Sequence, residues 1–252
     1  MSLLADPVTL AVVVIAVILL GMAKGGLAGV GALATPLAAL VLPPATAAAL
    51  LLPILIVQDI ISVWSFRHDW DGWIVGWMLP GAAIGVGAGY YYAERVDEAQ
   101  LMAALGAITL AFGAYRLWVG RGGRVVAASR SPGWVGTLFG GLMGFTSQIA
   151  HAGGPPFQMW VTPRKLPHLV FIGTSAVVFA IVNWMKVPAY LALGAFPREV
   201  IVAALLMMPL AIVSTLVTVR WMKRMEGERF YILIYMLMIL LGAKLLWDGV
   251  QG

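Results

Sequence analysis

Long apolar segments and short polar connections alternate along the whole chain. A helix that crosses the hydrocarbon core of a bilayer needs about 20 apolar residues, and most of the segments approach or exceed that length. The segment 157–161 is much too short to cross and 27–42 is short, so whether these two span or re-enter stays open. The apolar segments run approximately over residues 8–23, 27–42, 45–66, 73–93, 101–119, 134–150, 157–161, 169–193, 200–221 and 230–247.

The composition places these segments in a bilayer. Of the 252 residues, 62% are hydrophobic and 11% are charged, whereas a soluble domain carries roughly 45–50% apolar and about 25% charged residues. Only helices and closed barrels can span a membrane. The apolar runs are continuous and not alternating, which favours helices. We therefore predict an all-α polytopic membrane protein whose first apolar run, which lacks a basic leading region, is a retained helix and not a signal peptide.

The two halves of the chain repeat one another. Four residues of the first half recur at one constant offset in the second, in matching positions of apolar segments, and at a slightly smaller offset Asp59 aligns with Asn183. We predict a first transmembrane repeat over 1–120, a basic cytoplasmic linker over 121–133 and a second repeat over 134–252. The four recurring pairs are Pro80 and Pro209, Arg95 and Arg224, Gly113 and Gly242, and Trp118 and Trp247.

The charges of the connections indicate how the two repeats are oriented. If each half contributes an odd number of crossings, or three crossings plus a pair that enters and returns, only Arg95 and Arg198 fall on the outer side. The positive-inside rule favours this arrangement, which makes the repeats inverted and puts both termini outside. The net charge of +5 is then explained by cytoplasmic loops, with no nucleic-acid partner. The residues predicted to be cytoplasmic are Arg67, Arg121, Arg124, Arg130, Arg164, Lys165, Arg220, Lys223, Arg224 and Arg229.

Each half contains a stretch that should break a helix. A helix broken inside a bilayer leaves free N–H groups that must line a cavity or be buried in protein, and these groups attract anions. Lys24 and His151 would add positive charge, so the breaks predict an anion site. Three alternatives stay open: glycine pairs that only let helices pack, a Lys24 that snorkels to an interface, and a His151 that makes a structural hydrogen bond. The residues of the breaks are Lys24, Gly25, Gly26, Gly29 and Gly31 before Pro36, and His151, Gly153 and Gly154 before Pro155 and Pro156.

Other polar residues lie deep inside apolar segments. A charge at the centre of a bilayer costs between about 3 and more than 10 kcal/mol by differing estimates, so such residues usually pair or serve a function. We expect Asp59 and Gln58 to serve proton coupling or gating of transport. The alternative is that Asp59 is a static counter-ion that neutralises Lys24 or Lys186. The residues expected to complete the wall of the anion site are Thr174, Ser175, Asn183 and Lys186.

These motifs together resemble a known family. The motifs are Lys24-Gly25-Gly26 with Gly29, Gly31 and Pro36, Leu52-Pro53-Ile54 with Asp59, Leu79-Pro80-Gly81, the run from Ala150 to Pro156, Gly173-Thr174-Ser175, and Asn183 with Lys186. Across essentially its whole length the chain resembles the TauE/SafE sulfite exporter family of small bacterial membrane proteins. The resemblance implies transport of sulfur-containing anions, such as sulfite and organosulfonates, across the inner membrane. The His-Ala-Gly-Gly-Pro-Pro form departs from the plainer glycine run of many members, which bears on the substrate and not on the transport class.

The functional prediction is a secondary transporter, an exporter of a small sulfur oxyanion, in the bacterial inner membrane. Import of the same anions, transport of another small anion, and a passive channel stay open as alternatives. An intramembrane enzyme is disfavoured because the chain has no His-Glu-x-x-His, Gly-x-Ser-x-Gly or P-loop motif. A membrane subunit that transports nothing is equally disfavoured. We expect no cofactor and no metal, the bilayer and the anion as partners, and a homo-oligomeric state that the sequence leaves open.

Overall fold

The computed structural model describes residues 3–27, 29–121, 131–222 and 229–251. Within these ranges the chain is built from helices and contains no strand, as the sequence predicted. The helices are α1 (Pro7–Lys24), η1 (Val30–Leu33), α2 (Ala34–Ala38), α3 (Pro44–Ser65), α4 (Gly72–Ala93), α5 (Glu98–Arg121), α6 (Gly133–Ala150), α7 (Gly154–Val161), η2 (Thr162–Arg164), α8 (His168–Ala192), α9 (Arg198–Met222) and α10 (Arg229–Gln251).

Six helices in the described part of the chain are long and apolar enough to cross a membrane: α1, α3, α4, the Glu98–Tyr115 part of α5, α8 and α9. Large apolar side chains point outward from the bundle. Ile84 is 71% exposed and Leu206 is 62% exposed, which would be an aggregation liability in water and is the expected surface in lipid. The chain is therefore a multi-pass membrane protein.

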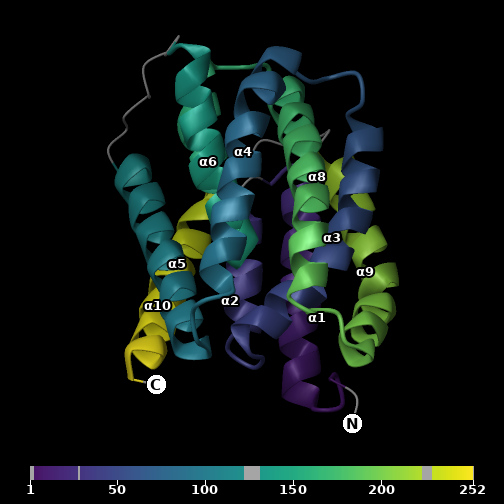
Figure 1. Cartoon of the computed structure of the whole chain (residues 1–252). Helices are drawn as coiled ribbons and strands as arrows, with labels where there is room; N and C mark the ends of the chain where they lie inside the picture. Colours follow the sequence, from purple (N-terminus) through teal and green to yellow (C-terminus); the bar gives the residue numbers. More distant parts are fainter. Residues whose placement is uncertain (1–2, 28, 122–130, 223–228, 252) are drawn as a thin grey trace.

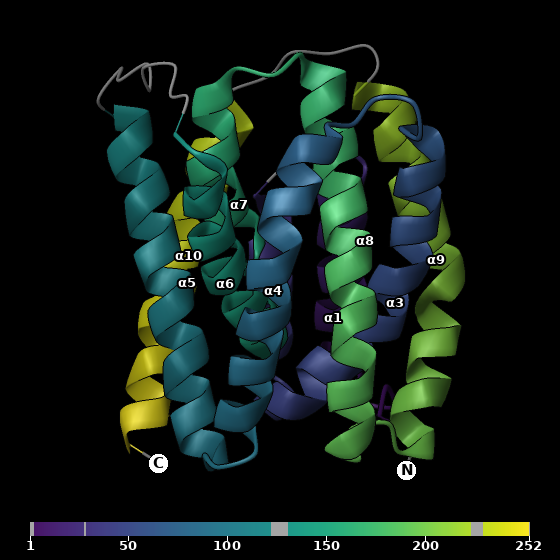
Figure 2. The same cartoon turned by 45° about the horizontal axis from the view of Figure 1, so that its top comes forward.

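The two short apolar segments do not form complete crossings. The segment 27–42 is divided into η1 and the five-residue helix α2, and 157–161 belongs to α7, which has eight residues. Figure 1 shows α3 beginning at the end of the bundle where α1 begins, so η1 and α2 carry the chain back towards that end. Figure 2 shows α7 beside α6, returning to the end from which α6 starts.

The two ends of the bundle carry different charges. Figure 1 places the start of α1, the end of α10 and the α4–α5 and α8–α9 connections at one end, called here the termini end. The α3–α4 and α7–α8 connections and the end of α9 lie at the other end, the basic end. Arg67, Arg164, Lys165 and Arg220 belong to the basic end, whereas Arg95 and Arg198 belong to the termini end. Arg124, Arg130, Lys223 and Arg224, and most of the predicted linker 121–133, lie outside the described residues, and only the backbone of Arg121 and Arg229 is described.

Glycines let the principal helices approach at backbone distance. The extensive contacts are those of α4 with α6, α5 with α10, α9 with α1 and α3, and α8 with α3 and α4. A Cβ at Gly81 of α4 would lie 1.8 Å from the Thr137 carbonyl oxygen of α6, and one at Gly144 of α6 would lie 2.2 Å from the Ala82 carbonyl oxygen of α4. Small residues at helix interfaces are the usual means of close packing in lipid. These glycines therefore serve helix packing.

Candidate functional site

The two breaks face one another across a cavity inside the bundle. This central cavity has a volume of about 80 Å³, several times the roughly 10–15 Å³ that one water molecule needs. It is therefore the size of a small polyatomic solute. Its polar wall consists of Lys24 and the backbone of Gly26, Gly29 and Gly31 from the first break, Ser147, His151, Gly154 and Gln158 from the second, and Ser175 and Asn183 from α8.

At the first break the chain turns on glycines. Helix α1 ends at Lys24, and Gly26 and Gly29 adopt φ angles of +124° and +100°, a region that side chains with a Cβ rarely enter. A Cβ at Gly26 would also lie 2.9 Å from Ile172 of α8. The last turn of α1 is closed by the Ser62 hydroxyl of α3, which donates to the Lys24 carbonyl oxygen at 2.7 Å.

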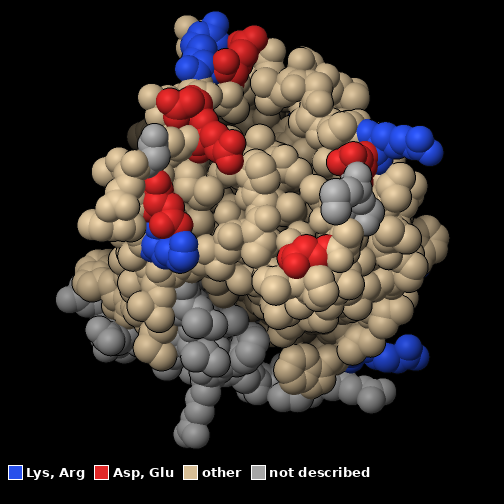
Figure 3. Space-filling model, turned by 90° about the horizontal axis from the view of Figure 1, so that it is seen from below, with Lys and Arg blue, Asp and Glu red and all other residues tan. Residues whose placement is uncertain are grey.

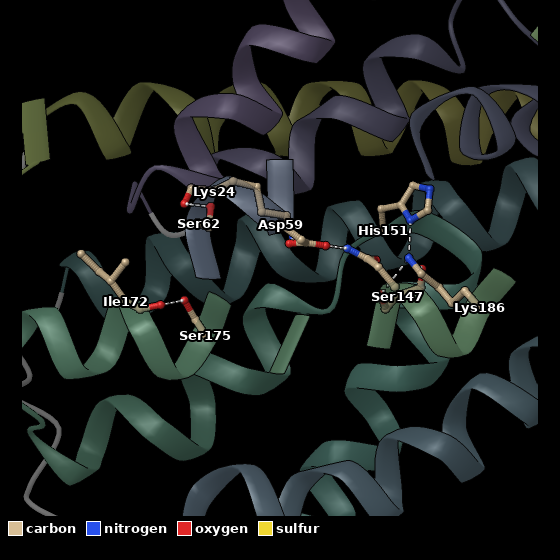
Figure 4. A network of polar contacts seen from close by, with 9 residues as sticks. Lys24, Asp59, Ser62, Ser147, His151, Ile172, Ser175 and Lys186 are labelled. Atoms are coloured by element: carbon tan, nitrogen blue, oxygen red, sulfur yellow. Dashed lines mark hydrogen bonds and ion pairs between the residues drawn. The ribbon is translucent and has the colours of Figure 1, made fainter. Parts of the chain in front are cut away.

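The charge of Lys24 is matched by a carboxylate. Lys24 Nζ lies 2.5 Å from Asp59 Oδ1, and Asn183 of α8 donates to Asp59 Oδ2, also at 2.5 Å. Figure 4 shows Lys24 and Asp59 close together. The Phe179 ring lies 5.2 Å from Lys24 Nζ, close enough for a cation–π contact. Both Asp59 oxygens are therefore occupied, and Lys24 presents the rest of its ammonium to the central cavity.

At the second break a histidine occupies the turn. Helix α6 ends at Ala150, and His151 follows in the left-handed conformation at φ 50°, where glycine is the usual residue. The turn is fixed by Ala152 N, which donates to the Thr146 carbonyl oxygen at 3.3 Å, and by the Thr146 hydroxyl, which donates to the Ala152 carbonyl oxygen at 3.1 Å. Since Pro155 and Pro156 have no N–H, the donors at the start of α7 are the N–H groups of Gly153 and Gly154.

A fully buried lysine supports this second turn. Lys186 of α8 is 0% exposed, and its Nζ lies 3.2 Å from the Ser147 carbonyl oxygen, 3.2 Å from the Ser147 hydroxyl and 2.6 Å from His151 Nδ1. His151 Nε2 lies 2.8 Å from the Ala48 carbonyl oxygen. A carbonyl can only accept, so Nε2 carries the ring proton and Nδ1 accepts from Lys186. Among the described residues, no carboxylate oxygen lies within 4.0 Å of Lys186 Nζ.

The structure brings eight of the predicted binding residues to the central cavity: Lys24, Gly26, Gly29, Gly31, His151, Gly154, Ser175 and Asn183. Gly25 instead packs against Thr218 of α9, and Gly153 against Met143 and Phe179. The Thr174 hydroxyl accepts from Asp71 N and donates to the Val170 carbonyl oxygen, at the start of α4. The predicted residues Lys186, Asp59 and Gln58 do not line the central cavity themselves. Gln58 Nε2 donates to the Val17 carbonyl oxygen of α1 at 3.3 Å.

The sequence did not single out Ser147, Gln158 or Phe179, which also line the central cavity. Ser147 precedes the second break by one helical turn, and Gln158 follows the prolines of this break. Their polarity and position beside the break could therefore have identified both as lining residues. Phe179 lies in an apolar run and carried none. Within the described ranges, no three His, Asp or Glu side chains come together in an arrangement that could hold a metal ion.

Comparison with known proteins gives one match. A family model described as sulfite exporter TauE/SafE matches residues 13–245, a range that contains both breaks and every residue of the site. Neither the curated proteins nor the solved structures include a match to the chain.

Proposed function

The chain belongs to the TauE/SafE sulfite exporter family, and on this premise we propose that it is a secondary transporter that exports a small sulfur oxyanion, such as sulfite or an organosulfonate, across the bacterial inner membrane. The observation that carries the proposal is the central cavity, which both breaks line and which has the size of a small anion. The anion would lie between Lys24 on one side and His151 and Gly154 on the other.

The charges around the central cavity favour an anion. The Lys24 charge is matched by Asp59. Lys186 Nζ lies within hydrogen-bond distance of three neutral acceptors. An ammonium group has three N–H donors, so each donor has one acceptor. A buried charge without a partner is costly, and an anion held beside His151 and Ser147 would balance it. The N–H groups of Gly153 and Gly154 at the start of α7 add directional donors and the positive end of a helix dipole.

The packing of the helices supports two inverted repeats over 1–120 and 134–252. The chain runs through α1, α3, α4 and α5 in directions opposite to those of α6, α8, α9 and α10. Exchanging the two sets of helices in order converts the α1–α9 contact into α6–α4, and α3–α9 into α8–α4, while α3–α8 and α5–α10 map onto themselves. Secondary transporters with inverted repeats bind substrate at the repeat interface, beside broken helices. The basic end would face the cytoplasm and both termini the outside.

The contacts at the breaks follow the same exchange. Asp59 and Asn183, which the repeat aligns, hydrogen-bond to each other, as expected of equivalent residues beside a pseudo-twofold axis. One turn further on, Ser62 and Lys186 each donate to the carbonyl end of the broken helix in their own half. We propose that Asp59 couples or gates transport, because a proton on Asp59 would remove the charge that holds Lys24 and release the ammonium to the anion. The neighbouring Gln58 amide would hold α3 to α1 as this occurs.

The direct test is ligand binding to the purified protein. We expect sulfite, thiosulfate, sulfate or sulfoacetate to raise the unfolding temperature, whereas a neutral sulfone should not. At a ligand concentration 100 times the Kd the stabilisation should be about 2.7 kcal/mol. Equal responses to all five compounds, or none, would reject the anion site.

A glycine pair provides the matched variants. A Cβ at Gly154 or at Gly87 would meet nothing within 4 Å and neither residue has a positive φ, but only Gly154 lines the central cavity. Gly154→Ala should therefore reduce anion affinity without disturbing the fold, and Gly87→Ala should leave it unchanged. Saturable exchange of labelled anion by proteoliposomes would then separate a carrier from a channel.

A further inference from the structure

A second, larger cavity lies between the central cavity and the termini end. Its volume is about 480 Å³, within the roughly 300–1,000 Å³ of ligand-sized pockets. We call it the outer chamber. Its wall includes Leu3 beside the start of α1, Pro43 and Thr46 at the start of α3, Tyr190 and Gly194 at the end of α8, and Glu199 at the start of α9.

Two helices, α3 and α8, line both cavities, and their residues show in which order the cavities lie along the bundle. On α8, Ser175, Phe179 and Asn183 line the central cavity and Tyr190 lines the outer chamber. At 1.5 Å per residue, Asn183 and Tyr190 are about 10 Å apart along the helix axis. Helix α3 has the same order, with Leu55 on the central cavity and Ala48 and Thr46 on the outer chamber. The central cavity and the outer chamber thus follow one another along the bundle axis, with the outer chamber nearer the termini end.

Two stacked rings lie between the two cavities. His151 lines the central cavity, and its ring contacts two walls of the outer chamber: Nε2 lies 2.8 Å from the Ala48 carbonyl oxygen, and the ring stacks on Tyr190 at a centroid distance of 6.2 Å. The Tyr190 hydroxyl donates to the Gln148 carbonyl oxygen at 3.0 Å. Lys186 holds the other side of the imidazole through Nδ1, as Figure 4 shows. The partition is therefore the His151 ring backed by the Tyr190 ring.

The electrostatic character changes across this layer. The central cavity is lined by Lys24 and backed by Lys186, whereas the one charged side chain on the described wall of the outer chamber is Glu199. Figure 3 shows acidic side chains on the termini end, with basic side chains beside several of them. Gln148 Oε1, which is buried on the chamber wall without a hydrogen-bond partner, is an acceptor and adds no attraction for an anion. The described wall of this chamber therefore carries no positive side chain that would retain an anion.

From this arrangement we propose that the outer chamber is the release vestibule of the anion path and that His151 with Tyr190 is its gate. The inference rests on the proposed transport function and adds to it the route and the side of release. The anion binds beside His151, the imidazole moves away from Ala48 and Tyr190, and the anion passes into a chamber that does not retain it. This difference in charge between the two cavities affects the rate and affinity on each side and leaves the equilibrium gradient unchanged.

Because the chain has no cysteine, labelling of a single introduced cysteine measures access to its position without labelling of any native thiol. Thr46→Cys places a thiol on the outer chamber and Ser175→Cys places one on the central cavity. In oriented membrane vesicles, a membrane-impermeant methanethiosulfonate added on the side of the termini should label the first and not the second. Adding His151→Ala to Ser175→Cys should raise labelling from that side at least tenfold, whereas His168→Ala, which removes an exposed imidazole at the start of α8, should leave it low.

Three results would overturn the gate: labelling of Ser175→Cys from the termini side in the otherwise unchanged chain, no increase with His151→Ala, or no labelling of Thr46→Cys from that side. If His151→Ala does not fold, Tyr190→Ala, which removes the other half of the partition, is required to give the same increase. Anion binding is measured on the same proteins in separate buffers. Binding with a failed labelling pattern rejects only the gate, and the expected labelling without any anion binding rejects the proposed function.

Discussion

The two breaks differ in how they turn the chain and in how they treat charge. The first turns on glycines at positive φ and pairs Lys24 with the Asp59 carboxylate. The second turns on His151, and the nearest cation, Lys186, is surrounded by neutral acceptors. The first break therefore contains an ion pair, whereas no carboxylate oxygen of the described residues lies within 4.0 Å of Lys186 Nζ at the second. We therefore propose that the Asp59 pair mainly holds the site together and that Lys186 adds to its affinity for anions.

The largest expected effect is on the ion pair of the first break. Asp59→Leu leaves the Lys24 ammonium without a counter-ion and should destabilise the protein by about 3–5 kcal/mol, whereas removing both charges in Lys24→Met/Asp59→Leu should be close to neutral. Denaturant unfolding of detergent-solubilised protein measures both.

A double variant as unstable as Asp59→Leu would show that the pair is not a static counter-ion arrangement. The proton role of Asp59 is tested separately with Asp59→Asn in proteoliposomes. Loss of the response to a pH gradient with intact anion binding would support coupling, and unchanged proton-driven transport would exclude it.

The next effect concerns the cation of the second break. Lys186→Met should lower anion affinity by about ten- to a hundredfold, since hydrogen bonds and contacts to charged groups contribute roughly 1.5–3 kcal/mol. Lys244→Met is the matched control, because Lys244 is exposed, is paired with Asp248 and does not line the central cavity. Isothermal titration with sulfite compares the two. Equal affinities would mean that the second break does not supply the charge.

The backbone requirement of the two turns should also differ. Gly26→Ala forces a Cβ into a φ of +124° and against Ile172, and should cost about 1–3 kcal/mol of stability. His151→Gly places the favoured residue at a left-handed position, so its loss of stability should come only from the ring contacts. Unfolding curves of the two variants, each compared with the parent chain, measure this. If Gly26→Ala does not lower stability, the first turn does not require glycine, and the two breaks do not differ in their backbone requirement.

The smallest effect is expected at the carbonyl end of α1. Ser62→Ala removes the hydrogen bond to the Lys24 carbonyl oxygen and should cost about 0.5–1.5 kcal/mol, with anion affinity unchanged. Ser65→Ala is a suitable control, since its hydroxyl donates to the Ile61 carbonyl oxygen of its own helix. A loss of anion affinity in Ser62→Ala but not in Ser65→Ala would show that this hydrogen bond also positions Lys24 for the anion.

Much of the fold follows from the sequence because bilayer insertion depends on segment hydropathy, which is a local property. The predicted segment 73–93 becomes α4 (Gly72–Ala93), and 169–193 becomes α8 (His168–Ala192). The breaks were also predictable, since Gly26 and Pro155 limit the backbone wherever they stand. That Asp59 selects Lys24 rather than Lys186 depends on the rotation of three helices, and no local pattern specifies that.

The same limit explains the differences within the site. Thr174 and Ser175 are neighbours on α8, yet only Ser175 lines the central cavity, because the Thr174 hydroxyl faces Asp71 at the start of α4. Which of two adjacent helical residues faces a cavity is decided by packing against other helices. Gly173 illustrates the constraint: a Cβ there would lie 1.7 Å from the Asp69 carbonyl oxygen, so this close approach fixes the rotation of α8.

The interleaved packing of the helices has a consequence for biogenesis. Helix α4 packs mainly on α6, and α5 mainly on α10, so the principal neighbours of the first half are synthesised after it. At about 5–20 residues per second, translation of the second half takes seconds, during which the bare glycine surface of α4 faces lipid. Packing of the first half is therefore completed by association of helices in the plane of the membrane, after α10 has been synthesised.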